Sequence, residues 1–240
     1  MPRRGVDDSP PDRHRISSFS THERPSYWGV RHTVRQHPLL TIYVGLLVAG
    51  FTVYGIAIDA HLAVPYALVV TGGALTVASI HERVGLTSDA LWGLALWATG
   101  HMAGGTIQLG GGRVLYNAWL LPHHALRYDQ AVHVVGFGFA TLVCAQALAR
   151  WLAPNASRFG VGVITVMAGL GVGAVNEIFE FFTTLLIDNT NVGGYQNTGW
   201  DLVADLVGAI VAAAYWSRGL GMRQVSKLTQ TAAGTSKPAG

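Results

Sequence analysis

Six long apolar segments restrict the fold of this chain more than any other feature of its sequence. Each holds about 20 mainly apolar residues, enough for an α-helix to cross a bilayer at 1.5 Å rise per residue. Only 12% of the 240 residues are charged, about half the fraction in a typical soluble domain, which is roughly 25%. We therefore predict an all-α, polytopic membrane helix bundle with six transmembrane helices, at residues 39–58, 62–80, 89–109, 131–152, 161–187 and 200–216.

The distribution of basic residues predicts the orientation of these segments. Of the 16 Lys and Arg residues, all except Arg113 and Arg127 fall on the side that carries both termini. Since basic residues concentrate on the cytoplasmic side, we expect both termini to be cytoplasmic. The net charge of +3 then reflects topology and the lipid bilayer as partner, with no nucleic acid. We predict a disordered basic tail at 1–38, a transmembrane domain at 39–217 and a second disordered tail at 218–240.

Ionisable residues inside the predicted helices are the features that need a chemical explanation, because each costs roughly 2.5–3.5 kcal/mol on insertion scales. Six of them form pairs spaced three or four residues apart, so each pair shares a helix face. Given the predicted helix directions, all seven lie at a similar depth, in the outer half of the membrane. We expect them to face one cavity open to the outside. They are Asp129 with His133, Glu177 with Glu180, Asp201 with Asp205, and His101 alone.

Five carboxylates at one level cannot all stay ionised without cations, because like charges raise one another's pKa. A bound divalent metal, shared protons, or ion pairs with Arg127 and the histidines would each solve this problem. Carboxylates with an imidazole suit Mg²⁺, Mn²⁺, Zn²⁺ or iron, although the Glu-x-x-His pairs of di-iron proteins are absent. We predict metal ligands or acid–base groups at His133, Glu177, Glu180 and Asp205. The predicted outer partners or substrate contacts are Asp129, Tyr128, Asp201, Arg127 and His101.

Simpler explanations exist for some of these residues. Asp129 and Asp201 are near predicted helix N-termini, where capping and the helix dipole explain a carboxylate equally well. For His101, a hydrogen bond between helices is favoured over a ligand role. The other three carboxylates lie deeper and have no capping explanation, which favours function.

Three stretches of this sequence resemble a known family. LRYDQAVHVVGFG, NEIFEFF and GYQNTGWDLVADLVGA, preceded by the His101-Met-Ala-Gly-Gly segment, are similar to the YjdF-like proteins. These are bacterial inner-membrane proteins built around a domain of unknown function. The order of the acidic motifs is also distantly similar to that of VanZ-like proteins. The resemblance implies a multi-pass protein of the bacterial cytoplasmic membrane and no particular activity. The chain departs from the family in the loop between the third and fourth predicted helices, which contains Gly110-Gly111-Gly112 and His123-His124.

Three functions are compatible with these observations. The first is a metal-dependent membrane enzyme acting on a lipid-linked or envelope substrate from the outer side, in which Arg127 receives a phosphate. The second is a non-enzymatic scaffold or partner subunit whose polar groups join the helices. The third is a proton- or cation-coupled carrier, against which the chain shows no inverted repeat. We rank them in that order; the sequence identifies neither substrate, metal nor oligomeric state.

Overall fold

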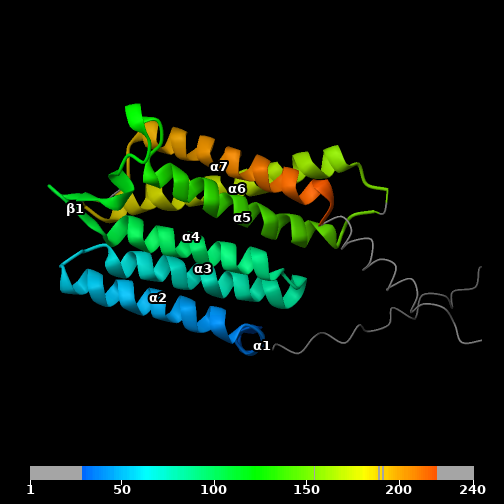
Figure 1. Cartoon of the computed structure of the whole chain (residues 1–240), viewed down its shortest axis with the longest axis horizontal. Helices are drawn as coiled ribbons and strands as arrows, with labels where there is room; N and C mark the ends of the chain where they lie inside the picture. Colours follow the sequence, from blue (N-terminus) through cyan, green and yellow to red (C-terminus); the bar gives the residue numbers. More distant parts are fainter. Residues whose placement is uncertain (1–28, 154, 189, 191, 221–240) are drawn as a thin grey trace, which may run out of the picture.

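The structure is a bundle of long helices that run alternately in opposite directions (Figure 1). It is a computed structural model that describes residues 29–153, 155–188, 190 and 192–220. The first and last of these lie at the same end of the bundle, and the longest connecting loop lies at the other end. The predicted all-α class is confirmed. The long helices are α2 (Pro38–Ala57), α3 (Ala63–Val84), α4 (Ser88–Thr106), α5 (Tyr128–Ala149), α6 (Arg158–Leu186) and α7 (Tyr195–Tyr215).

Five of the long helices are long and apolar enough to cross a membrane, namely α2, α3, α5, α6 and α7. This confirms a protein with several candidate membrane helices. The exception is α4, which spans 19 residues and contains His101 and several glycines. It lies against α2, α3 and α5, so much of its surface meets protein and needs less hydropathy than a helix surrounded by lipid. A sixth span and the side of the termini stay predictions.

A short helix, α1 (Gly29–Gln36), occupies part of the segment for which we expected a disordered tail. It packs across the end of α3. The backbone N and the Oγ1 of Thr33 both donate to Glu82 Oε1, at 2.7 and 2.6 Å. The prediction is therefore wrong for residues 29–36, because contacts with α3 order a polar segment that composition alone assigns to disorder. Residues 1–28 and 221–240 lie outside the described residues, and η3 (Trp216–Leu220) extends α7 as a π-helix.

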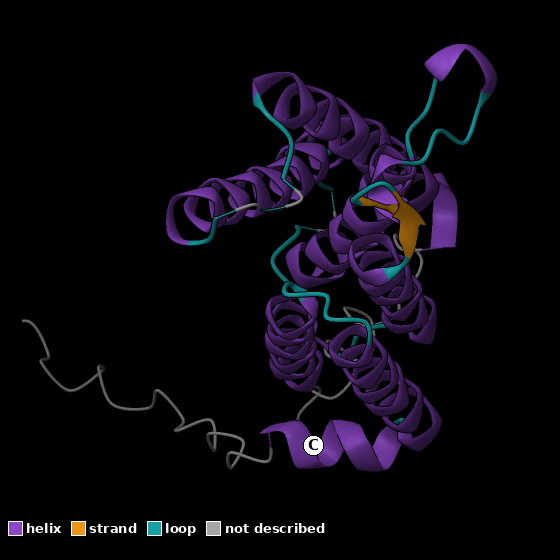
Figure 2. Ribbon diagram, turned by 90° about the vertical axis from the view of Figure 1, so that its left-hand side faces the viewer, coloured by secondary structure: helices purple, strands orange, loops and turns teal. Residues whose placement is uncertain are grey.

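The loop between α4 and α5 forms a compact cap on one end of the bundle. It begins with a hairpin of β1 (Gln108–Gly110) and β2 (Arg113–Val114), which is in front in the end-on view of Figure 2. The three glycines at 110–112 all have positive φ, which allows the tight reversal. Two 3-10 turns follow, η1 (Leu115–Asn117) and η2 (Pro122–His124). A backbone bridge between Trp119 and Arg127 closes the loop directly before α5.

Glycines allow the helices around the centre of the bundle to approach closely. A Cβ at Gly208 of α7 would lie 2.3 Å from the carbonyl oxygen of Val134 in α5, and one at Gly173 of α6 only 2.2 Å from Asp205 Oδ2. Small residues at such crossings allow the dispersion contacts that hold helices together in lipid. The buried positions of α6 repeat every four residues along one narrow strip: Val161, Thr165, Gly169, Gly173 and Glu177.

Candidate metal centre

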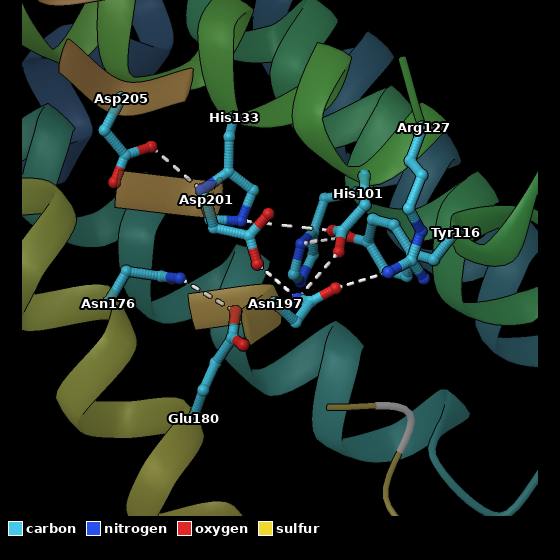
Figure 3. A network of polar contacts seen from close by, with 10 residues as sticks. His101, Tyr116, Arg127, His133, Asn176, Glu180, Asn197, Asp201 and Asp205 are labelled. Atoms are coloured by element: carbon cyan, nitrogen blue, oxygen red, sulfur yellow. Dashed lines mark hydrogen bonds and ion pairs between the residues drawn. The ribbon is translucent and has the colours of Figure 1, made fainter. Parts of the chain in front are cut away.

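His133 is the hub of a polar cluster between α5, α6 and α7 (Figure 3). Its side chain is 6% exposed, and its Nδ1 lies 2.8 Å from Oδ1 of the fully buried Asp205. Because a carboxylate oxygen accepts, Nδ1 carries the proton and donates it. The second nitrogen, Nε2, lies 4.0 Å from Asp129 Oδ1. A carboxylate behind an imidazole fixes the tautomer and ring orientation, which is the arrangement found behind metal-binding histidines.

Two groups of potential metal ligands share this imidazole. One combines His133 with Asp129 and Asp201, and the other combines it with Glu177 and Glu180; within each group the ligand atoms lie within 4.8 Å of one another. The two groups thus bring four predicted ligand or partner carboxylates close to the ring. Asp205 belongs to neither group and contacts Nδ1.

Asn197, which the sequence analysis did not single out, organises the first group. Its Nδ2 donates to Asp129 Oδ2 at 3.1 Å and also to Asp201 Oδ2. The other oxygen of Asp201, Oδ1, is buried and has no hydrogen-bond partner among the described residues. One oxygen of each aspartate is therefore held by the amide, while the other remains available to a cation.

The two glutamates of α6 also offer oxygens to the cluster. Asn176 Nδ2 donates to Glu180 Oε1 at 2.9 Å, which leaves Oε2 without a hydrogen bond within the described part of the chain. Glu177 is 7% exposed, and neither of its buried oxygens has a described hydrogen-bond partner. Burying a carboxylate without a partner is costly. A bound cation would remove this cost, and oxygen donors with one imidazole are ligands that Mg²⁺, Mn²⁺ or Zn²⁺ accepts.

Arg127 is close to the cluster but does not neutralise it. Across the described residues, the ion pairs within 4.0 Å are those of His133 with Asp129 and Asp205. The Arg127 Nη1 donates instead to the neutral Asn197 Oδ1. Of the solutions proposed for the clustered carboxylates, pairing with this arginine is therefore not seen here.

His101 lies in a separate aromatic environment beside the cluster. Its Nδ1 is 2.6 Å from the Tyr116 hydroxyl, and its ring packs against Trp97 and Tyr66 at centroid distances of 5.2 and 5.0 Å. Burial raises the pKa of Tyr116 well above its usual value, so the phenol keeps its proton. His101 is in neither ligand group, and its observed contact is a hydrogen bond from α4 to η1. Tyr128 donates to the carbonyl oxygen of Gly100 at 3.2 Å.

Spacing could have revealed two of the residues that sequence reasoning missed. Asn197 precedes Asp201 by four residues, and Asn176 precedes Glu180 by four, so each amide shares a helix face with the acid it contacts. Tyr116 carries no such signal, because its loop brings it to His101 only after folding.

The fold and the cluster together define a helical membrane protein with an acidic and imidazole centre. The chain belongs to the family described as "Predicted membrane protein (DUF2238)", which matches residues 39–221. The expected YjdF-like membership is confirmed, since that is the usual name of this family. No curated protein and no solved structure matches the chain.

Proposed function

We propose that this protein binds one divalent metal ion at His133 and is a metal-dependent enzyme acting on a lipid-linked or envelope substrate. The observation that carries the proposal is the burial of Glu177 with both oxygens unpartnered among the described residues, next to an imidazole already oriented by a carboxylate. A cation at this position would compensate the buried charge. Without it, the carboxylate would have to take up a proton or remain unpaired.

In this proposal, His133 Nε2, Glu177 and Glu180 hold the ion, with Asp129 and Asp201 completing its oxygen ligands. This assignment changes three roles from the sequence prediction, because Asp205 orients the imidazole and does not ligate, whereas Asp129 and Asp201 become ligands. The ion supplies Lewis-acid chemistry, polarising a phosphoryl or carbonyl oxygen or activating a water molecule.

The distribution of charge supports an outer-side location for this centre. The cluster lies near the bundle end that carries the α4–α5 loop, to which Arg113 and Arg127 belong. The other described arginines lie at the opposite end, as expected for the cytoplasmic side of a six-span protein with α4 as the third span. They belong to α1, the end of α3, the residue after α5, the start of α6 and η3, namely Arg31, Arg35, Arg83, Arg150, Arg158 and Arg218.

Mn²⁺ titration of the purified full-length chain in detergent, followed by electron paramagnetic resonance, tests metal binding. We expect one bound ion per chain in the wild type and a loss of affinity of about 100-fold or more in Glu177→Gln, since even an outer partner contributes 10–100-fold. Glu82→Gln is the matched control, because Glu82 contacts Thr33 at the other end of the bundle. Equal Mn²⁺ affinity in both variants would contradict the proposal.

Catalysis is tested separately with the Mn²⁺-loaded protein and a total lipid extract from bacterial membranes. Mass spectrometry should show a lipid that is altered by the wild type and by Glu82→Gln but not by Glu177→Gln. If the loaded wild type leaves every lipid unchanged, the lipid-linked enzymatic part of the proposal is wrong even where metal binding holds.

A structural scaffold is the second candidate function, favoured by the bonds that join α5 to α7. His133 with Asp205 and Asn197 with Asp129 both link these helices. If the cluster served only this purpose, Asn197→Ala and Glu177→Gln would both lower thermal stability and no metal would bind.

A further inference from the structure

Arg127 is a cation placed beside the proposed metal centre without an acidic partner of its own. Its guanidinium has five N–H donors, of which one hydrogen bond, to Asn197 Oδ1, is found within the described residues. No carboxylate oxygen of the described chain lies within 4.0 Å of it. An arginine next to five acids would normally pair with one of them, so this separation has a structural cause.

That cause is Asn197, whose amide stands between the guanidinium and the aspartates. The carbonyl oxygen accepts from Arg127, and the Nδ2 donates to Asp129 and Asp201. Both N–H donors of the amide and one lone pair of its oxygen are thereby used, and the guanidinium is held one side chain away from the first ligand group. The Arg127 guanidinium therefore stays close to the proposed metal site without forming an ion pair with Asp129 or Asp201.

The surroundings of Arg127 fix its position and place it at an apolar surface. The backbone bridge to Trp119 anchors the residue, and its Cζ lies 5.9 Å from the centre of the Trp119 ring. Trp119, Leu120 and Leu121 are 46–50% exposed. Exposed tryptophan and leucine side chains at the end of a membrane bundle suit the interface with lipid headgroups.

We propose that Arg127 binds the phosphate of a lipid headgroup whose oxygen also contacts the metal ion, a proposal that rests on the proposed function. The planar guanidinium matches a phosphate with two parallel hydrogen bonds. The neighbouring carboxylates repel an anion, so phosphate binds well only after the divalent ion has entered. Asn197 acts as a positioning residue that sets the distance between the guanidinium and the ion.

The test measures Mn²⁺ binding first, and then phosphate binding to the Mn²⁺-loaded full-length chain. One arm adds pyrophosphate to the protein in detergent; the other places the protein in nanodiscs with or without phosphatidic acid. Mn²⁺ resonance reports both events. We expect phosphatidic acid to alter the Mn²⁺ signal of the wild type, with Arg127→Gln weakening this effect about tenfold to 100-fold while Mn²⁺ affinity is kept. Arg113→Gln, an exposed arginine in the same loop, is the matched control.

The outcomes distinguish the phosphate site, its lipid source and the metal site. Equal phosphatidic acid responses in Arg127→Gln and Arg113→Gln, with Mn²⁺ bound, would overturn the phosphate site and leave the metal site standing. A response to pyrophosphate alone, lost in Arg127→Gln, keeps the phosphate chemistry and overturns the lipid source. If wild type binds no Mn²⁺, the proposed function fails, and the phosphate site, which needs the ion, is overturned with it.

Discussion

Two glutamates, one half-buried at the α1–α3 contact and one buried in the α5–α7 half of the bundle, differ in the number of hydrogen bonds that their carboxylates accept. Glu82, at the α1–α3 contact, accepts two hydrogen bonds from Thr33 on one oxygen. Glu177, in the α5–α7 half, has no hydrogen-bond partner among the described residues, although it is less exposed. The first carboxylate is satisfied by its own chain and joins two helices. The second carboxylate has no such partner in the described part of the chain, which is why we propose a function for the α5–α7 half and a supporting role for the other.

The largest expected effect comes from removing both glutamates of α6. At a Mn²⁺ concentration of 100 times Kd, the free energy of unfolding of the wild type should rise by about 2.7 kcal/mol. The double variant Glu177→Gln with Glu180→Gln should show no such rise, because the ligands are lost. Denaturant unfolding in detergent with and without Mn²⁺ measures this. If Mn²⁺ raised the free energy of unfolding of the double variant as much as that of Glu82→Gln, the assignment of metal binding to the α5–α7 half would be wrong.

The next effect concerns the packing that holds the α5–α7 half together. Gly208→Ala should lower the free energy of unfolding by about 1–3 kcal/mol, because its Cβ would meet backbone atoms of Val134 and Gly138 that cannot move aside. Gly171→Ala is the control, since nothing lies within 4 Å of its Cβ position. That control should be neutral or more stable by up to about 1 kcal/mol, through helix propensity. Similar thermal stabilities for the two variants would refute this packing argument.

A smaller effect is expected from Asp205→Asn. The amide oxygen still accepts from His133 Nδ1 but no longer brings a negative charge behind the imidazole. Mn²⁺ affinity should therefore fall by about tenfold, at the lower end of the range for such partners. Calorimetric titration of the variant beside Glu177→Gln measures the difference. A loss as large as that of Glu177→Gln would indicate that Asp205 is itself a ligand.

The smallest effect should follow Thr33→Val, which removes one of the two hydrogen bonds to Glu82. Amide hydrogen exchange should become faster in α1 while Mn²⁺ affinity stays the same, because α1 and the metal centre share no described contact. A change in Mn²⁺ affinity, or a change in the effect of Mn²⁺ on amide exchange, would show that the α1–α3 contact and the α5–α7 half are energetically coupled.

Apolar length and charge spacing were sufficient to predict most of the architecture and the pairing of the acids. The segments at 39–58 and 161–187 correspond closely to α2 and α6. Helix periodicity paired Glu177 with Glu180, and the predicted helix directions placed His133 at the same depth. The exchange of roles between Asp205 and Asp201 could not be predicted. Both lie on one face of α7, and which of them meets Nδ1 depends on how far α7 is rotated against α5.

Two other features depend on contacts between distant segments and so leave little trace in local sequence. Residues 29–36 form α1 because α3 offers Glu82 and His81 at its end. Tyr116 reaches His101 because the hairpin folds the loop back over α4. Composition describes a segment in isolation, whereas the contacts made by these two segments come from other parts of the chain.

The strip on α6 whose residues recur every fourth position has a consequence for how this helix can vary. Glu177 shares that strip with Gly169 and Gly173, which fit against Thr141 and Asp205. One residue inserted between Gly173 and Glu177 would turn the acid by about 100° around the helix axis, toward the side where Phe179 and Phe182 are exposed. Substitutions on the outward face of α6 should therefore be tolerated. An insertion or deletion between its glycines and its acids should not.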